Sequence, residues 1–332
     1  MALPVLVAHT GYSPYLEFTL RQAAAWAGRD HVVFLGDRAN ARVNVVRRVD
    51  GDAPEFRAAA DRVGAVYRHM STNTAAFELA AIQRWFRLHA LMEREGLGRA
   101  LVLDSDVLLY AGADELADWV GGAEVGLATP AGQPPYGWES SGHSAVWTAD
   151  RLGAFCDFAV RAYAEPAERE RLEAKWRHHL ATGDPGGICD MTLFYLFAEA
   201  QPPGAVLNVT EARDGAVFDH NAAMTLGAVP GEYPLGPGGL KPVRWRAGRP
   251  TVARASGEAV RFLTLHLQGP AKAAIPELYR GPDFPGRVAL GRRLARYHRA
   301  RGLAGRVKYA AWTGLRRALG RAQRAGAPGR WA

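Results

Sequence analysis

Two carboxylates stand two residues apart inside an apolar stretch, "RALVLDSDVLLY", which covers residues 99–110. Such a run is typical of a buried strand, and side chains at i and i+2 of a strand project to the same side. Two carboxylates about 5 Å apart repel each other by roughly 3 kcal/mol at an effective dielectric constant of 20. A divalent cation removes this penalty because Mg²⁺ and Mn²⁺ favour hard oxygen ligands. Asp104 and Asp106 are therefore predicted metal ligands.

The alternative is a strand that ends at Leu103, with Asp104 capping a turn and Asp106 in solvent. The flanking residues favour the metal, since a solvated turn is rarely bounded so closely by apolar chain on both sides. Ligands of open α/β sheets also bind beyond the carboxyl ends of the strands. Mg²⁺ sites typically combine one or two carboxylates with substrate phosphates. We therefore expect a metal–diphosphate site.

A second candidate motif lies 160 residues downstream, in "TLHLQGPAK" (264–272). A predicted strand reaches His266, a potential metal ligand when its imidazole is neutral. Gly269 would let the backbone approach a phosphate, and Lys272 would supply a point charge for a diphosphate. A packed, purely structural histidine is the alternative for His266 taken alone. Together with Asp-x-Asp, the motif is much more specific.

Alternating strand and helix patterns surround these motifs. The expected strands are 3–9, 31–37, 41–49, 100–104, 124–129, 144–148 and 259–269. The expected helices are 15–28, 54–62, 77–96, 150–164, 166–180 and one that opens after the Gly-rich turn at 183. Strands that are apolar on both faces and alternate with helices predict an α/β fold, with a mixed, mainly parallel sheet covered on both sides.

Charge divides the chain into two parts. The net charge is +8, but residues 284–332 hold 13 Lys and Arg and no acid, which leaves residues 1–283 with 28 basic and 33 acidic groups. No apolar run is long enough to span a membrane, and the N-terminus lacks a secretory pattern. The two cysteines imply no disulfide framework. These features predict a cytoplasmic protein with a catalytic domain (1–283) and a basic tail (284–332).

The basic tail has apolar residues at near-helical spacing, with a predicted break at Gly302–Gly305; they are Leu290, Leu294, Tyr297, Leu303, Val307, Trp312, Leu315 and Leu319. A basic amphipathic helix is typical of an anionic membrane surface. We therefore predict peripheral attachment to the inner face of the cytoplasmic membrane. A disordered extension and a nucleic-acid contact are the alternatives, and the acidic body makes nucleic acid an unlikely main partner.

The motifs "VLDSDVLLY" and "HLQGPAK" resemble those of retaining glycosyltransferases of the glycogenin-like and lipooligosaccharide galactosyltransferase-like family, which have the GT-A fold. The resemblance covers about residues 3–275 and is strongest at these two motifs. It implies a Mn²⁺ or Mg²⁺ ion that binds the diphosphate of a nucleotide sugar. The matching metal ligands are Asp104, Asp106 and His266, with Gly269 and Lys272 on the phosphates.

Further matches concern the donor nucleotide. In "AHTGYSPYL", Tyr12 stands where the family stacks a tyrosine on uracil, while His9 and Thr10 replace acids. An ordinary turn aromatic is the alternative for Tyr12. The family also places an arginine on the helix before the metal strand, where Arg87 and Arg84 lie on one face; a solvated helix charge is the alternative for either. Ser105, between the two acids, completes the predicted donor-binding set.

The family's sugar-side motifs are altered in this chain. Its Asn-Ala-Gly loop corresponds to Ser140-Ser141-Gly142, and of its Asp-Gln-Asp turn only Asp190 is kept. Asp190 is the predicted carboxylate at the sugar, and helix N-capping is the rival explanation. Tyr136 and Trp138 are candidates for an aromatic platform of the kind found in carbohydrate sites.

The predicted reaction is transfer of a hexosyl group from a nucleotide sugar to an acceptor hydroxyl. The expected donor is a UDP-sugar and the expected acceptor is a cell-envelope glycan or glycolipid, with retention implied by the resemblance. The metal would act as Lewis acid, with Asp190, Arg87 and Lys272 as catalytic residues. The alternatives are an inactive transferase that only binds sugar nucleotide and a sugar nucleotidylyltransferase.

Overall fold

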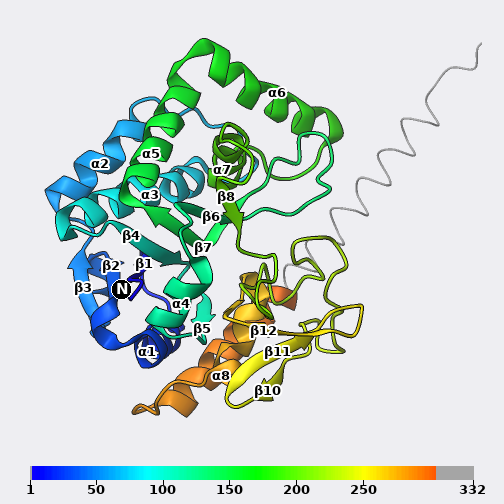
Figure 1. The fold of residues 1–332 in the computed structure, drawn as a ribbon. Coiled ribbons are helices and arrows are strands. Elements are labelled where there is room, and N and C mark those ends of the chain that lie inside the picture. The colour runs from blue at the N-terminus through cyan, green and yellow to red at the C-terminus, as the bar shows by residue number, and fades with distance from the viewer. Residues whose placement is uncertain (1, 304–332) are drawn as a thin grey trace, which may run out of the picture.

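A seven-stranded sheet forms the centre of the molecule, whose computed structural model describes residues 2–303 (Figure 1). The spatial order of its strands is β3-β2-β1-β4-β7-β6-β8. The strands are β1 (Val5–His9), β2 (Val32–Gly36), β3 (Arg47–Asp50), β4 (Arg99–Leu103), β6 (Val125–Ala128), β7 (Ser141–Thr148) and β8 (Val206–Asn208). Only β7 runs antiparallel to its neighbours, so the predicted mixed, mainly parallel sheet is confirmed.

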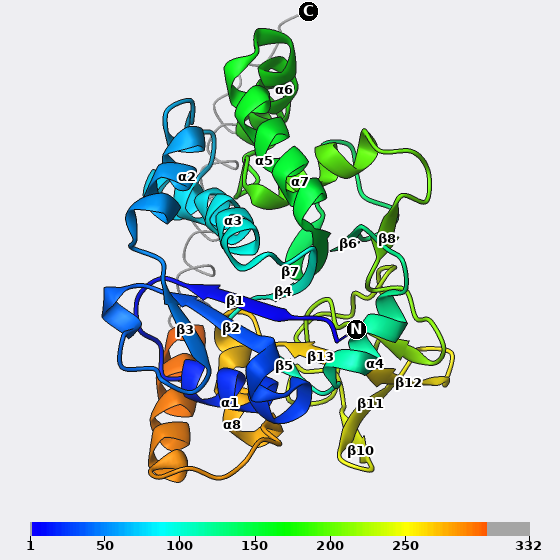
Figure 2. The same ribbon diagram turned by 60° about the vertical axis from the view of Figure 1, so that its left-hand side comes forward.

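Helices cover both faces of this sheet (Figure 2). One face carries α2 (Pro54–Gly64), α3 (Ala75–Glu95), α5 (Ala149–Ala164) and α7 (Asp190–Glu199), with α6 (Pro166–Thr182) outside α5. The other carries α1 (Leu16–Ala27), α4 (Ala113–Val120) and α8 (Ile275–Leu278). Short 3₁₀ turns occur at η1 (Arg29–His31), η2 (Arg38–Asn40) and η3 (Gly269–Ala274).

The central strands are apolar throughout because each contributes to two cores. In β1, Val5 and Val7 pack on the α1 side, whereas Leu6 packs on the α3 side. In β4, Leu101 and Leu103 likewise face α1, and the alternate residues face α3. Successive strand residues point to opposite faces, so a strand that is buried on both sides has no polar position.

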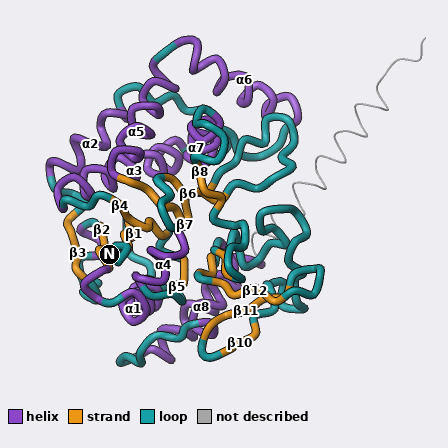
Figure 3. Tube along the Cα trace, in the orientation of Figure 1, coloured by secondary structure: helices purple, strands orange, loops and turns teal. Residues whose placement is uncertain are grey.

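The predicted single strand over 259–269 is wrong, because the chain switches sheets at Leu263. β12 (Ala259–Phe262) belongs to a four-stranded sheet with β9 (Ala216–Val217), β10 (Arg244–Arg246) and β11 (Arg249–Ala253). Figure 3 shows the loop-rich surroundings of this small sheet. β13 (Thr264–His266) instead pairs antiparallel with β5 (Val107–Leu109). Its register places His266 opposite Val107, directly after the second acid of the Asp-x-Asp motif.

The two acids do not lie on an extended strand, which corrects the reason given for their proximity. β4 ends at Leu103, and Asp104, Ser105 and Asp106 form a turn before β5. The Val107 amide donates to the Asp104 carbonyl over 3.0 Å and closes this turn. The turn, and not a strand pleat, therefore presents both carboxylates. The strand predicted over 41–49 is also shorter, since β3 begins only at Arg47.

The start of the basic tail packs against the domain as a helix over 287–303. Leu294 is buried in the core on the α1 side, and Leu290 packs on that core. Gly291 and Gly302 lie on the same face: a Cβ added at either would come within 2.9 Å of a proline of the 269–278 segment. Gly302 is helical, and the rest of the predicted break, like the apolar positions from Val307 onward, lies outside the described residues.

No helix within residues 2–303 combines the length and the apolar character that a membrane crossing requires.

Candidate active site

A cavity of about 730 Å³ lies at the carboxyl-terminal edge of the parallel strands. Ala8 and His9 of β1, Leu35 and Gly36 of β2, and the turn after β4 form its floor. The first half of α3 and the start of α7 form its opposite wall. Its size is within the range of small-molecule sites, and this edge of an α/β sheet is where ligands bind.

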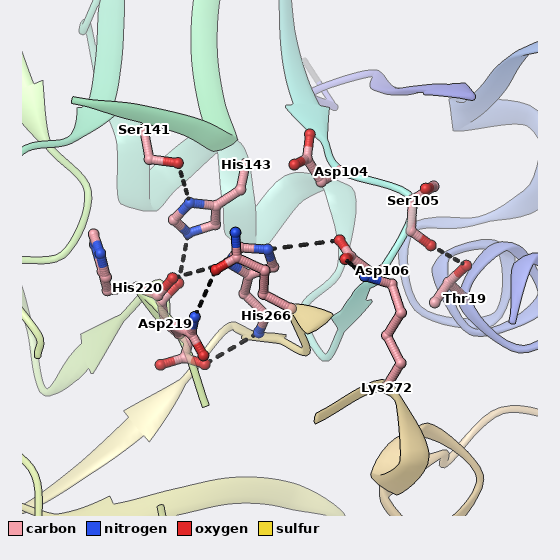
Figure 4. Close-up of polar contacts among 12 residues, drawn as sticks. Thr19, Asp104, Ser105, Asp106, Ser141, His143, Asp219, His220, His266 and Lys272 are labelled. Carbon is pink, nitrogen blue, oxygen red and sulfur yellow. Dashed lines mark hydrogen bonds and ion pairs between the residues drawn. The ribbon is translucent and has the colours of Figure 1, made fainter. Parts of the chain in front are cut away.

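Asp104, Asp106 and His266 meet on the floor of this cavity (Figure 4). One ligand atom of each residue lies within 4.8 Å of the others, and His266 Nε2 is 3.6 Å from Asp106 Oδ1. Asp106 and His266 are buried and Asp104 is half-buried. The structure therefore brings together the three predicted ligands from two distant segments, through the pairing of β13 with β5.

Hydrogen bonding sets the tautomer of His266 in a way that suits a metal ligand. Its Nδ1 lies 2.9 Å from the His220 carbonyl, which can only accept, so Nδ1 carries the proton. Nε2, on the side of Asp106, is then the nitrogen that would bind a metal ion through its lone pair. A backbone carbonyl that accepts from the other ring nitrogen is a usual partner of a metal-bound histidine. Two carboxylates and one imidazole thus form a chemically suitable donor set for Mn²⁺ or Mg²⁺.

A buried polar network lies behind His266, and sequence reasoning did not find it. His143 of β7 stacks on His266 with ring centroids 4.2 Å apart, and its Nε2 donates to the Asp219 carbonyl over 2.7 Å. Asp219 Oδ2 accepts the backbone N–H of His266 over 3.1 Å, and Oδ1 pairs with Lys241 at 2.6 Å. Both side chains of the Asp219–Lys241 pair are fully buried. The network fixes the position of the imidazole.

This arrangement predicts that the carboxylate oxygen of Asp219 supports metal affinity. Two double variants test it, Asp219→Asn/Lys241→Met and Asp219→Ala/Lys241→Met, because both remove the lysine that would otherwise be buried without a partner. Only the first keeps an oxygen for the His266 amide. We expect Mn²⁺ affinity, measured by calorimetric titration, to be about 10-fold weaker in the alanine variant, the scale of outer-sphere effects. Equal affinities in two folded variants would contradict this role.

Two cations neutralise the acidic pair. Lys272 Nζ lies 2.5 Å from Asp106 Oδ2, and Arg84 of α3 lies 2.5 Å from Asp104 Oδ1. Burial opposes ionisation of Asp106, but the charges of His266 and Lys272 outweigh it and hold its pKa below the ordinary value of 3.8. The carboxylate is therefore ionised at neutral pH and available to a divalent cation.

Asp190 lies at the first turn of α7 but does not cap it, since Cys189 occupies the N-cap position and makes no side-chain cap bond. Its Oδ2 accepts from Trp85 Nε1 over 3.0 Å and lies 3.1 Å from Arg84. Arg84 thus bridges Asp190 to Asp104 across the cavity wall. Burial raises the pKa of Asp190 above 3.8, with Arg84 opposing this effect.

Most of the other predicted donor-binding residues line the cavity: His9, Thr10, Arg84, Arg87, Ser105 and Lys272. His9 Nδ1 is 2.9 Å from Ser105 Oγ, and burial lowers the pKa of His9, so its ring is neutral at pH 7. Arg87 has no hydrogen bond or ion pair to any residue of 2–303, which leaves its guanidinium available to a ligand. Tyr12 and Gly269 are not among the residues that line this cavity. The guanidinium of Arg42 covers the Tyr12 ring at 3.6 Å.

Further charged residues of the cavity were not predicted, among them Asp37, Glu78 and Lys175. Asp37 follows β2, and its carboxylate accepts the Gly11 amide over 2.7 Å. Glu78 is buried and accepts from Ser71 Oγ at 2.7 Å. Lys175 comes from α6, a helix whose charged sequence indicates a solvated surface. Their local sequences resemble those of ordinary turns and helices, so only the tertiary arrangement reveals them.

No protein-family model matches the chain, and no curated protein matches it. The chain is similar over part of its length to several solved structures. They include mouse xyloside xylosyltransferase 1 (13% identity, 62% of this chain and 84% of that chain, TM-score 0.40) and the PaToxG glycosyltransferase (12%, 60% and 70%, 0.35). A cytidylyltransferase from Leptospira borgpetersenii is also similar (15%, 52% and 73%, 0.30).

Proposed function

We propose that this chain is a metal-dependent glycosyltransferase that uses a nucleotide-diphosphate sugar. The observation that carries the proposal is the convergence of Asp104, Asp106 and His266 in one cavity, with Lys272 and Arg84 beside the two acids. Carboxylates alone would suit many cation sites. Carboxylates, an imidazole and a lysine together in a cavity at the sheet edge suit a cation that is shared with a diphosphate.

Each side chain has a role that follows from its position. A bound Mn²⁺ or Mg²⁺ would supply Lewis-acid stabilisation of the leaving diphosphate. A cation held by Asp106 would leave Lys272 free to bind phosphate oxygens, and Arg87, which has no ion pair within residues 2–303, would add a second positive charge. His9 and Thr10 lie at the end of β1, where the nucleoside would bind. Asp190 lies where an ionised carboxylate would stabilise positive charge at the anomeric carbon.

Details of the substrate rest on the sequence resemblance. We propose a UDP-sugar as donor, a hydroxyl of a cell-envelope glycan or glycolipid as acceptor, and retention of anomeric configuration. His9 and Thr10, which replace acids of the family, are neutral partners for the base or ribose.

The direct test is incubation of the protein with a panel of nucleotide sugars, with and without Mn²⁺, and measurement of slow hydrolysis to free sugar. We expect hydrolysis of at least one donor only when Mn²⁺ is present. Release of pyrophosphate from a nucleoside triphosphate and a sugar phosphate would instead identify a nucleotidylyltransferase. Nucleotide binding without hydrolysis or transfer would indicate an inactive relative.

We also propose that the protein is cytoplasmic and binds anionic membranes through the exposed face of the 287–303 helix. That face carries Arg292, Arg293, Arg296 and Arg299, none of which has a carboxylate partner within residues 2–303, together with exposed Val288, Tyr297 and Leu303. Each arginine near an anionic surface contributes on the order of 1 kcal/mol. Leu290 and Leu294 are not available to lipid because they pack on the domain.

Replacing the four arginines with glutamine tests this attachment without removing the helix. We expect at least a tenfold loss of binding to vesicles of phosphatidylcholine with phosphatidylglycerol, in a flotation assay, with an unchanged melting temperature. Truncation before residue 287 is unsuitable because it would also remove Leu294 from the core. Equal flotation of both proteins, or equal binding to pure phosphatidylcholine, would contradict the proposal.

A further inference from the structure

The loop between β6 and β7 has a strained backbone beside the cavity. Tyr136 and Trp138 have φ angles of 61° and 39°, in the left-handed region that non-glycine residues rarely adopt. Each such residue costs about 1–2 kcal/mol, and such strain persists only where the surroundings impose it. We refer to residues 133–139 as the aromatic loop. Both strained positions are aromatic, although a simple connection between antiparallel strands would favour glycine or asparagine there.

A buried lysine holds the aromatic loop in this conformation. Lys175 is 2% exposed, and its Nζ donates to the carbonyls of Gly137 and Trp138 at 2.7 and 3.3 Å and to Thr192 Oγ1 at 2.9 Å. It forms no ion pair with any residue of 2–303. Burying an ammonium group without a carboxylate contributes unfavourably to the free energy of folding, and here the buried group holds the turn in place. Thr192 belongs to α7, which links the loop to the helix that carries Asp190.

The side chain of Gln133 closes the loop from within. Its Nε2 donates to the Glu139 carbonyl over 2.7 Å, and its Oε1 accepts the Glu139 amide over 2.6 Å. The Gly137 amide also donates to the Pro134 carbonyl over 2.8 Å. These hydrogen bonds restrain the loop, so little conformational entropy would be lost when a ligand binds to it.

Its two aromatic rings are half-exposed, and their centroids lie 5.1 Å apart. Tyr136 stacks on His178 with centroids 4.9 Å apart. The Trp138 ring is nearly parallel to that of Tyr195, with centroids 6.4 Å apart, and the Arg171 guanidinium lies 5.7 Å from the Trp138 centroid. The next residue, Glu139, lines the cavity, as do Ser141, Lys175 and His179, the neighbour of His178. The two rings themselves do not line the cavity, and the aromatic loop borders it through Glu139.

We propose that the aromatic loop is the binding site for a sugar ring of the acceptor. A pyranose presents C–H groups on its faces, which suit the negative faces of aromatic rings, and hydroxyls on its edge, which suit polar groups. Glu139 has no ion pair within residues 2–303 and can accept hydroxyl hydrogen bonds at the cavity side. Lys175 is a positioning residue that acts through the loop. The inference rests on the proposed function, since it assigns the second substrate of the same cavity.

Binding of simple glycosides to the full chain tests the proposal without knowledge of the natural acceptor. The probes are the methyl β-glycosides of galactose, glucose and N-acetylglucosamine, measured by saturation-transfer NMR in the presence of Mn²⁺ and UDP. We expect at least one to bind with a dissociation constant in the millimolar range. Tyr136→Ala should weaken that binding at least tenfold, whereas Tyr297→Ala, on the distant 287–303 helix, should not change it. No binding of any glycoside, or equal binding to both variants, would overturn the proposal.

Lys175→Met and Lys175→Arg separate positioning from folding. We expect the methionine variant to bind the same glycoside at least tenfold more weakly while its Mn²⁺ affinity is unchanged, and the arginine variant to recover part of the loss. Parallel loss of Mn²⁺ and glycoside binding would mean a general structural role and would overturn the positioning role. Mn²⁺ titration of the wild type reports separately on the proposed function, because it does not depend on the aromatic loop.

Discussion

Asp106→Asn is expected to weaken Mn²⁺ binding by more than about 100-fold, beyond the range of changes in residues that only support a metal ligand. The substitution removes the negative charge of Asp106, whose carboxylate contacts Lys272 and His266, but keeps the shape of the side chain. The Asp106 carbonyl still accepts the Leu267 amide, so the pairing of β5 with β13 is retained. Metal-dependent turnover of the donor should therefore fall at least as far while the fold persists.

Calorimetric titration with Mn²⁺, circular dichroism and donor hydrolysis together measure this effect. Asp118→Asn is a matched control, because Asp118 is exposed on α4 and forms no ion pair with the described residues. If the Asp106→Asn protein binds Mn²⁺ as tightly as the wild type, the proposed metal site is wrong. The main support for a transferase is then lost as well.

Residue types predicted much of this site because its chemistry is local. Asp104 and Asp106 are neighbours in the chain, and His266 ends an apolar run, so each motif was visible by itself. The proximity of the two motifs depends on the pairing of β13 with β5, which the sequence pattern did not indicate. The apolar run 259–269 looks continuous, yet it changes sheets at Leu263, and only the second half pairs with β5. Hydrophobic periodicity does not distinguish one strand from two strands in sequence.

The supporting residues could not be predicted for a different reason. Asp219 and Lys241 are 22 residues apart in an irregular region, and nothing local indicates that they form a fully buried pair. Lys175 lies on a helix whose pattern is that of a solvated surface, yet the residue is only 2% exposed. Conversely, Tyr12 matched a family position, but Arg42, 30 residues away, occupies its ring face.

Asp190→Asn is expected to lower the turnover number by at least about 100-fold while Mn²⁺ affinity remains within about threefold of the wild type. These factors correspond to about 2.7 and 0.6 kcal/mol. Asp190 is not a predicted metal ligand, and asparagine can still accept from Trp85 Nε1. Only the negative charge is lost, which is the property needed to stabilise positive charge at the anomeric carbon. Steady-state donor hydrolysis at saturating Mn²⁺ measures the effect.

The stability of this variant distinguishes a catalytic carboxylate from a structural one. Burial raises the pKa of Asp190 above 3.8 in the folded protein, so its ionisation opposes folding. The free energy of unfolding of the wild type therefore decreases as the pH rises from about 3.8 through the folded pKa of Asp190. Asparagine does not titrate, so the variant shows no such decrease. We expect the free energy of unfolding of the variant, relative to the wild type in urea, to increase between pH 4 and pH 7. The opposite result is a variant whose stability relative to the wild type decreases between pH 4 and pH 7. It would show that ionised Asp190 stabilises the fold through Arg84, and the loss of turnover would then have a structural cause.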